Sequence, residues 1–361
     1  MKEARISPFT RTPGIAGKAL IETHYSEDII QNFESLDSYK YVYKIVGLRG
    51  SGKSVEYSLV MDYFREQSNW LVYALSAGGD PLQTLISLMS RENFVDAKTK
   101  NRSYRVNAKL GGSLAIASAE SGISSEITTG DNDRYYSDEA ALKDMLVLAK
   151  KAGFRVLIGI DDIAKTDDMV RFLSILGIIF MEPDKDVRFI CTGLSKNIED
   201  FVNVPHLSFF VRNESITMKP LNLHSMTQKY RVLLGISHEQ AAVLAKFTCG
   251  YAYGYQVLGE ICFNLQKSSI DEEVEATFDE NIGSQYDLIW STLTVAEQEL
   301  VKLILNSETG TVAEIKSKME KESSFASLRS RLMKKHILQS SARGMINIPL
   351  PRFREYVNLW Q

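Results

Sequence analysis

Apolar residues in the first 220 positions fall into short uniform runs separated by longer stretches with helical spacing. Five runs, at 41–46, 70–75, 155–160, 187–192 and 216–218, are typical of buried β-strands. The stretches between them predict helices at 26–33, 55–64, 81–91, 137–152, 167–180 and 197–202, and Asp80 and Ser137 suit the N-caps of two of these. Strands that alternate with helices predict a parallel sheet covered by helices.

One segment of this region has a different pattern of apolar and polar residues. Val106, Ala108 and Leu110 alternate with polar residues, as do Leu114 and Ile116 after a Gly-Gly pair. This pattern predicts a β-hairpin followed by a polar loop, so that 95–135 is an insertion in the α/β core.

After residue 220 the pattern becomes helical over 222–267, then acidic and irregular over 270–283. Three capping boxes open helices here, formed by Ser237 with Gln240, Thr294 with Glu297, and Thr311 with Glu314. A further helix from residue 323 or 324 to His336, and short strands at 338–341 and 345–348, complete a winged helix-turn-helix plan. We therefore expect a core at 1–220, a helical lid at 221–284 and a winged helix at 285–361.

Charge is distributed unevenly along the 361 residues, a length that suits two or three domains. Residues 311–361 hold ten Lys or Arg and four acids, a net charge of +6, whereas the whole chain carries −3, which leaves −9 for the remainder. A basic end on an acidic body indicates contact with a polyanion, or else a solvated basic face without a partner.

The compartment is indicated by what the sequence does not contain. Cys191, Cys249 and Cys262 are scattered in apolar surroundings without C-x-x-C spacing, so we expect three buried thiols in a reducing compartment. No run approaches the roughly 18 apolar residues of a membrane span, and residues 1–11 lack an apolar signal core. We expect a cytoplasmic protein without membrane contact.

Candidate chemistry begins at 47–54, which reads G-x-x-x-x-G-K-S between the first predicted strand and a helix. This is the spacing of a phosphate-binding P-loop, in which glycines let successive N–H groups face a phosphate. Lys53 is expected to reach the β and γ phosphates and Ser54 to bind Mg²⁺. The alternative is a Gly-rich turn without a ligand. The remaining residues expected to contact ATP or ADP are Gly47, Gly50, Ser51, Gly52 and Val55.

Two acidic residues follow the strand at 155–160. Asp161 is expected to hold Mg²⁺ beside Ser54, and Asp162 to orient the attacking water, slowly because Asp is one methylene shorter than Glu. Thr192, at the end of the next strand, is expected to face the γ-phosphate. The alternatives are a strand that ends in a polar turn and a threonine without a ligand.

Arg212 lies just before the last predicted strand of the core. An arginine there is a candidate arginine finger, directed at the nucleotide of its own chain or at that of a neighbour in a nucleotide-dependent homo-oligomer. A surface arginine without this role is the alternative.

In combination, these motifs resemble AAA+ ATPases of the origin-recognition/initiator type and their STAND relatives, the signalling NTPases. Within that group, 191–195 resembles the "AGLP" of bacterial ATP-binding proteins, 249–259 their "TxGYPYFIQLLG" lid helix, and 13–18 the "FVGR" box along the adenine. The resemblance implies a P-loop NTPase core, a lid and a C-terminal winged helix, with Gln256 of the lid at the nucleotide.

Three departures from this pattern indicate a nucleotide-gated switch more than a fast motor. Asp162 replaces the Glu of the initiator group, and Ala252 replaces the usual Pro of the lid motif. The lid helix at 253–263 contains no Arg, so the usual second phosphate-sensing arginine is absent.

The third helix of the expected winged helix places Phe325, Leu328 and Leu332 on its core side. Basic residues are left for the outer faces, where they would contact duplex DNA, with one more at the wing tip. Contact with a protein partner is the alternative. The residues concerned are Arg329, Arg331, Lys334, Lys335 and Arg343.

The sequence therefore predicts an ATP- and Mg²⁺-dependent switch associated with DNA. A regulatory STAND NTPase whose winged helix contacts protein is the second interpretation, and a nucleotide-binding scaffold without hydrolysis is the third.

Overall fold

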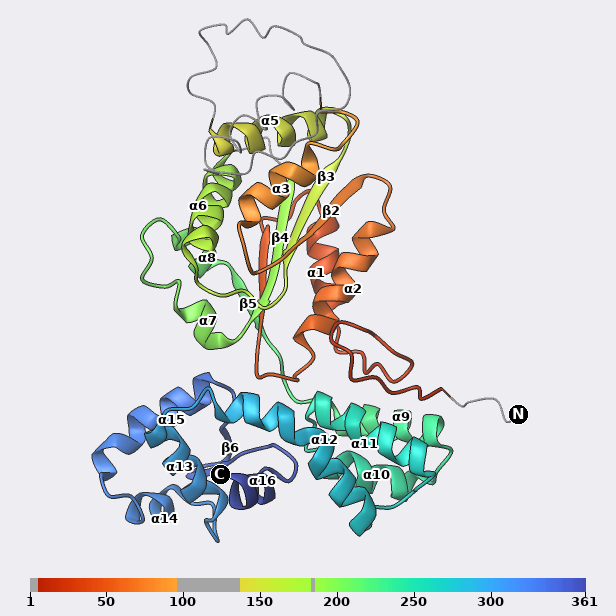
Figure 1. Cartoon of the computed structure of the whole chain (residues 1–361), viewed down its shortest axis with the longest axis vertical. Helices are drawn as coiled ribbons and strands as arrows, with labels where there is room; N and C mark the ends of the chain where they lie inside the picture. The colour runs from red at the N-terminus through yellow and green to blue at the C-terminus, as the bar shows by residue number, and fades with distance from the viewer. Residues whose placement is uncertain (1–5, 96–136, 183–185) are drawn as a thin grey trace, which may run out of the picture.

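The computed structural model describes residues 6–95, 137–182 and 186–361 (Figure 1). Its centre is a parallel five-stranded sheet in the order β2-β3-β4-β1-β5. The strands are β1 (Val42–Val46), β2 (Trp70–Leu75), β3 (Arg155–Ile160), β4 (Val187–Gly193) and β5 (Glu214–Thr217). Each predicted strand is confirmed to within two residues at each end. The hairpin expected at 95–135 falls outside the described residues, except for Val95.

Helices cover both faces of the sheet because the strands are apolar on both sides. On one face, α1 (Tyr25–Glu34) and α2 (Lys53–Arg65) bury Phe33 and Phe64 against the strands. On the other face lie α3 (Pro81–Met89), α5 (Asp138–Lys151), α6 (Asp167–Met181) and α8 (Ser208–Arg212). Asp80 and Ser137 cap α3 and α5 as predicted. Helix α7 (Ser195–Glu199) begins two residues and ends three residues before its predicted position.

The lid region consists of four helices, α9 (Leu223–Leu234), α10 (His238–Phe247), α11 (Ala252–Leu265) and α12 (Glu272–Trp290). The capping box of Ser237 and Gln240 is confirmed. The expectation of an irregular stretch at 270–283 is wrong, because Val274, Phe278 and Ile282 recur every four residues and are buried. Helix α12 crosses the boundary predicted at 284/285, and the domain limits stay a prediction.

The C-terminal region begins with α13 (Val295–Leu305) and α14 (Val312–Ser317), capped by Thr294 and Thr311. A 3₁₀ turn at Glu322–Ser324 leads into α15 (Phe325–Lys334). The antiparallel pair β6 (Gln339–Ala342) and β7 (Met345–Asn347) follows, and Thr311 adds a single bridge to Met345. The sequence interpretation did not include the last helix, α16 (Phe353–Trp360).

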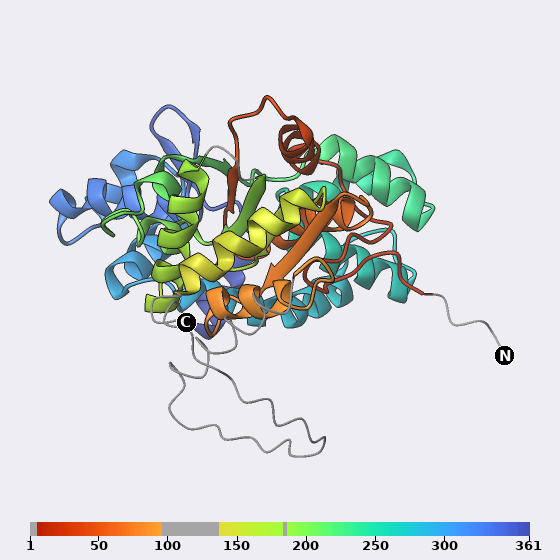
Figure 2. The ribbon, with the colours of Figure 1, turned by 90° about the horizontal axis from the view of Figure 1, so that it is seen from above.

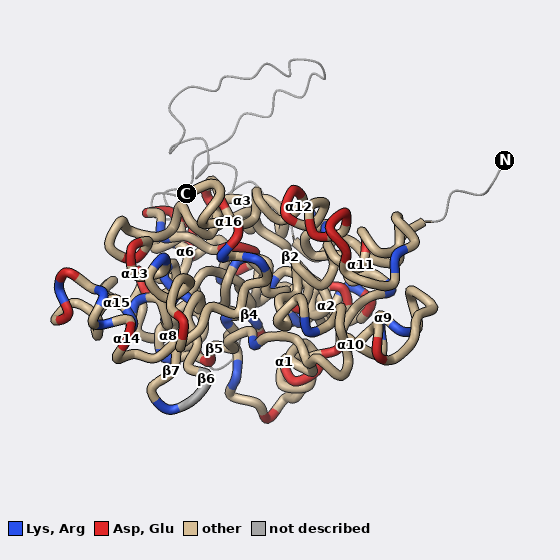
Figure 3. Tube along the Cα trace, turned by 90° about the horizontal axis from the view of Figure 1, so that it is seen from below, with Lys and Arg blue, Asp and Glu red and all other residues tan. Residues whose placement is uncertain are grey.

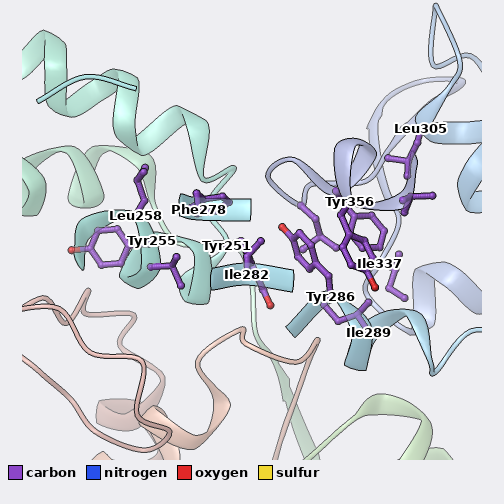
Figure 4. Close-up of a cluster of buried hydrophobic side chains, with 14 of the residues drawn as sticks. Tyr251, Tyr255, Leu258, Phe278, Ile282, Tyr286, Ile289, Leu305, Ile337 and Tyr356 are labelled. Atoms are coloured by element: carbon purple, nitrogen blue, oxygen red, sulfur yellow. The ribbon is translucent and has the colours of Figure 1, made fainter. Parts of the chain in front are cut away.

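The lid and C-terminal regions lie side by side at one end of the sheet (Figures 1 and 2). They share one hydrophobic core, in which Tyr251, Tyr286 and Tyr356 lie in a row across the two regions (Figure 4). The shared helix α12 and the continuous core make the two regions one packed body.

The expectation that all three cysteines are buried holds for two of them. Cys191 and Cys262 are buried as predicted, whereas Cys249 is exposed because it follows α10 in a turn, with φ at 53°. Among the described residues, no helix is both long and apolar enough to cross a membrane.

Candidate nucleotide-binding site

The P-loop connects the carboxyl end of β1 to the first turn of α2. Gly50 and Gly52 have φ values of 73° and 96°, a left-handed backbone that glycine adopts without strain. Gly52 is the N-cap of α2, so the loop delivers its free N–H groups and the positive end of the helix dipole to one place. This arrangement is suited to an anion.

Lys53 lies under the loop and is only 8% exposed. Its Nζ donates hydrogen bonds to the carbonyl oxygens of Gly47, at 3.2 Å, and Leu48, at 2.9 Å. Burial lowers the pKa of this ammonium group to about 8, against smaller opposing effects from Asp162 and Asp161. Phosphate groups near Nζ would restore a high pKa, because a nearby negative charge favours the protonated form.

Asp161, Ser54 and Thr192 meet at the carboxyl edge of the sheet. The Ser54 hydroxyl donates to Asp161 Oδ1 at 3.1 Å, and the Thr192 hydroxyl donates to the same oxygen. These oxygen donors fit Mg²⁺, which is usually held by one or two protein ligands plus water and phosphate. In the described part of the chain, no group of three or more His, Cys, Asp or Glu residues could hold a metal ion.

Thr192 is held between the two aspartates. Its oxygen accepts a hydrogen bond from the Asp162 N–H at 2.9 Å, and the residue is only 1% exposed. This threonine orients both carboxylate residues here, and its expected contact with the γ-phosphate stays a prediction.

Asp162 has a strained backbone, with φ at 56°, and its side chain is 54% exposed. Its Oδ2 lies 3.9 Å from Nη2 of Arg49. A non-glycine residue in this conformation needs support, which the Thr192 hydroxyl supplies. The carboxylate therefore lies at the mouth of the site, open to water.

A cleft of about 360 Å³ brings these groups together with the lid, a volume in the range of ligand sites. The N-terminal segment 10–17 forms one wall and α11 another. Gln256 of α11 accepts a hydrogen bond from the Thr10 N–H at 3.0 Å, so it joins these two walls. Seven further residues predicted for nucleotide or metal also line the cleft: Gly50, Ser51, Gly52, Val55, Asp161, Asp162 and Thr192.

Arg212 lies elsewhere. It ends α8 two residues before β5, at the amino end of that strand, whereas the P-loop follows the carboxyl end of the adjacent parallel strand β1. The distance along the sheet from the amino end of β5 to the carboxyl end of β1 is longer than an arginine side chain. Arg212 is exposed and lies away from the P-loop of its own chain. Its role as an arginine finger stays a prediction, and its position favours the nucleotide of a neighbour over that of its own chain.

The basic residues of the C-terminal region are less available than the sequence indicated. Lys335 is the clearest case, because its side chain is only 15% exposed and its Nζ donates to Glu297 at 2.7 Å and to the Thr292 carbonyl at 2.8 Å. The prediction of an outward-facing Lys335 is wrong, since the buried Glu297 carboxylate needs a cationic partner. Figure 3 shows basic and acidic segments side by side around α15.

The other four residues keep at least part of their charge at the surface. Lys334 pairs with Glu199 of α7 at 3.1 Å, and Arg329 donates to the Ser340 hydroxyl at 3.0 Å. Arg331 approaches Glu297 at 3.7 Å and is half-exposed. Arg343 is exposed in the β6–β7 turn.

Two residues that support the site from its surroundings escaped the sequence interpretation. Glu56, in the first turn of α2, is buried and accepts from the Thr23 hydroxyl at 2.6 Å and from the Ser26 N–H at 3.0 Å, which fastens the N-terminal segment to α2. Tyr251 donates to the Arg49 carbonyl of the P-loop at 2.9 Å. Two signals in the sequence pointed to them. One is an acidic residue in the helix after the P-loop, and the other is the group of aromatic residues at the start of the lid helix.

Comparisons with known proteins bear mainly on the fold. A family model described as "Domain of unknown function (DUF8462)" matches residues 284–357. No curated protein matches the chain.

Among solved structures, the Walker-type ATPase PABY2304 of Pyrococcus abyssi is similar over 96% of this chain and 99% of its own, with a TM-score of 0.62 at 11% identity. The Aeropyrum pernix ORC2 protein, solved as ADPNP-ADP complexes, is similar over 99% of this chain and 96% of its own, with a TM-score of 0.53 at 12% identity. The chain has the α/β P-loop ATPase fold of these proteins. A STAND protein from Pyrococcus horikoshii is similar over 98% of this chain and 44% of its own, with a TM-score of 0.40 at 16% identity.

Proposed function

We propose that this chain binds ATP with Mg²⁺ and hydrolyses it slowly, as a nucleotide-dependent switch. The observation that carries the proposal is the meeting of Lys53, Ser54 and Asp161 at a cleft between the core and the lid. The N–H groups of the P-loop and the Lys53 ammonium would bind the phosphates. Ser54 and Asp161 would hold Mg²⁺, which supplies charge neutralisation at the β and γ phosphates.

Other residues of the chain would orient the water molecule and enclose the nucleotide. Asp162, exposed at the cleft mouth, would orient the water molecule, and Thr192 would keep both aspartates in place. Gln256 and the segment 10–17 would enclose the nucleotide from the lid side. Nucleotide in this cleft would bias the angle between core and lid, which is the basis of a switch.

Isothermal titration with ATP and Mg²⁺ tests the binding step. We expect micromolar or tighter binding by the wild type and a loss of at least tenfold in Lys53→Ala. Lys40→Ala is a suitable control, because Lys40 is half-exposed and pairs with Glu214 at the edge of the sheet. Equal affinity of the wild type and Lys53→Ala would contradict the assignment of the site.

We further propose that the C-terminal region is a winged helix that contacts duplex DNA. The succession α13, α14, α15, β6 and β7 supports the winged-helix part, and the cations Arg329, Arg331 and Arg343 support the contact. About three phosphate contacts would give a log–log salt slope of roughly −3. Fluorescence anisotropy with the full chain tests this, since a fragment that starts at residue 286 would cut α12.

A specific observation favours a second candidate, a regulatory NTPase whose C-terminal region contacts protein. Two residues of the expected DNA surface, Lys334 and Lys335, already bind carboxylates within the chain. Charge reversal at Arg331 separates the two candidates. Loss of salt-dependent DNA binding in Arg331→Glu, but not in Lys316→Glu of α14, would support DNA contact, whereas a wild type that binds no duplex at 50 mM salt would favour protein contact.

A further inference from the structure

Two hydrogen bonds join the start of lid helix α11 to the P-loop. The Tyr251 hydroxyl donates to the Arg49 carbonyl oxygen at 2.9 Å, and the Tyr253 N–H donates to the Gly50 carbonyl oxygen at 2.9 Å. Tyr251 is 5% exposed and does not line the nucleotide cleft. It lines a separate cavity of about 200 Å³, together with Leu48 and Ser51 of the loop. The tyrosine therefore contacts the loop without reaching the nucleotide site.

Peptide geometry makes the Tyr251 contact a constraint on a phosphate-binding group. In a trans peptide the carbonyl of one residue and the N–H of the next point in opposite directions. When Tyr251 holds the Arg49 carbonyl, it fixes the Gly50 N–H on the opposite side of the loop. That N–H has no hydrogen-bond partner among the described residues, so it is free to donate to a phosphate oxygen.

Close approach explains why glycine occupies position 50. A Cβ atom there would lie 2.3 Å from the Tyr251 hydroxyl oxygen and 2.8 Å from Tyr253 Cβ. The positive φ of Gly50 is a second reason, but the tyrosines would exclude a side chain even without it. The lid and the loop are thus fitted to each other at this residue.

Tyr251 also connects this contact to the C-terminal region (Figure 4). Its ring lies stacked against Tyr286 of α12, with ring centroids 6.4 Å apart. Tyr286 in turn donates to the Pro351 carbonyl and packs against Phe353 of α16 at 4.9 Å. A continuous run of aromatic contacts therefore extends from the P-loop to the last helix.

We propose that Tyr251 is a positioning residue that holds the P-loop in its phosphate-binding conformation. The position of the lid is thereby coupled to nucleotide binding through the backbone of the loop. This rests on the proposed nucleotide binding. The lid helix has no arginine between residues 253 and 263 that could contact phosphate directly. The hydroxyl of Tyr251 supplies the link instead, and binding and lid position are coupled reciprocally.

Tyr251→Phe removes the hydroxyl and keeps the ring. Without its hydrogen bond the loop samples other conformations, and the apparent Kd rises as the binding-competent fraction falls. One hydrogen bond of ordinary strength corresponds to a rise in the Kd for ATP and Mg²⁺ of about three- to tenfold. With ATP and Mg²⁺ bound, a phosphate oxygen would protect the Gly50 amide, and hydrogen exchange at this amide should become faster by a similar factor in Tyr251→Phe.

Tyr230→Phe is the matched control, because this buried lid tyrosine donates to the Tyr255 carbonyl at 2.7 Å, away from the loop. We expect its nucleotide Kd and its Gly50 exchange rate to stay within twofold of the wild type. An unchanged Kd in Tyr251→Phe, or an equal rise of the Kd in Tyr230→Phe, would overturn the inference about Tyr251 and leave the proposed nucleotide binding intact. A wild type that binds no nucleotide would overturn the proposed function and this inference with it.

Discussion

Burial sets the charge state of Lys53 in the ligand-free protein. Its pKa of about 8 lies below the value of about 10.4 in an unfolded chain, so the folded protein loses this proton first as the pH rises. Phosphate would raise the pKa again, and binding above pH 8 must therefore take up a proton. We expect a constant Kd below about pH 7 and a rise approaching tenfold per pH unit above pH 8. Titrations between pH 6.5 and 9.5 measure this.

Lys53→Arg is the control for this pH dependence. The guanidinium group stays charged throughout the range, so any binding that this variant retains should lose the pH dependence. The same steep rise in Lys53→Arg would show that another group titrates.

The role in hydrolysis proposed for Asp162 can be separated from nucleotide binding. Its carboxylate is exposed at the cleft mouth, whereas its N–H is held by Thr192. Asp162→Asn keeps the shape and the backbone contact but removes the charge. We expect slow wild-type turnover, well below about 10 per second, and at least a tenfold lower kcat in Asp162→Asn with an unchanged nucleotide Kd. An unchanged kcat in single-turnover measurements would mean that the water is oriented by another group.

Among single residues, the sequence allows prediction of those that belong to a short continuous motif. Lys53, Ser54 and Asp161 follow from a loop and a strand end that have few geometric solutions. Tyr251 and Glu56 could not be predicted in the same way, because their partners, Arg49 and Thr23, become neighbours only when the lid and the N-terminal segment fold onto the core. The same reason explains Lys335, whose partner Glu297 lies on another helix.

Among the elements, helix α12 shows how charge can conceal a helix in a sequence. Its first turns carry Glu272, Glu273 and Glu275, which suggested an acidic, irregular stretch. Acidic residues at a helix N-terminus are favoured by the helix dipole, so the charge is compatible with a helix. The strands were easier to predict, because they are uniformly apolar runs bounded by polar turns.

Arg352 joins α12 to α16 and carries a strained backbone. Its guanidinium group contacts both carboxylate oxygens of Asp279 at 2.6 Å and Glu275 at 2.7 Å, and its φ is 54°. We expect Arg352→Ala to lower the free energy of unfolding by about 1–3 kcal/mol, because it leaves the acids of α12 without their cation. Arg352→Gly should be about 1 kcal/mol more stable than Arg352→Ala, since glycine tolerates the positive φ.

Urea unfolding of the two variants, with exposed Arg354→Ala as a control, measures both effects. If glycine and alanine at position 352 gave equal midpoints, the backbone strain would contribute nothing to stability.

In the whole molecule, the C-terminal region is docked against the α/β core through the end of α15. His336 Nε2 lies 2.6 Å from the Ser195 hydroxyl oxygen, and Lys334 pairs with Glu199, also in α7. Burial lowers the pKa of His336, with a smaller contribution from Lys53, so the imidazole is neutral near pH 7. The helix expected to contact DNA therefore faces its own core at one end, which makes DNA binding dependent on how the two regions are arranged.

Removing Glu199 tests this dependence in the full chain. The pair with Lys334 is about half-exposed and should be weak, so Glu199→Gln should leave the fold intact. If DNA contact is correct, the freed Lys334 adds one phosphate contact, and the log–log salt slope should become more negative by about 0.9. Lys334→Gln alone should change little, because that lysine is already engaged, but it should abolish the gain in the Glu199→Gln background. Equal salt slopes for the wild type and Glu199→Gln, measured by fluorescence anisotropy, would show that Lys334 does not contact DNA when released from the core.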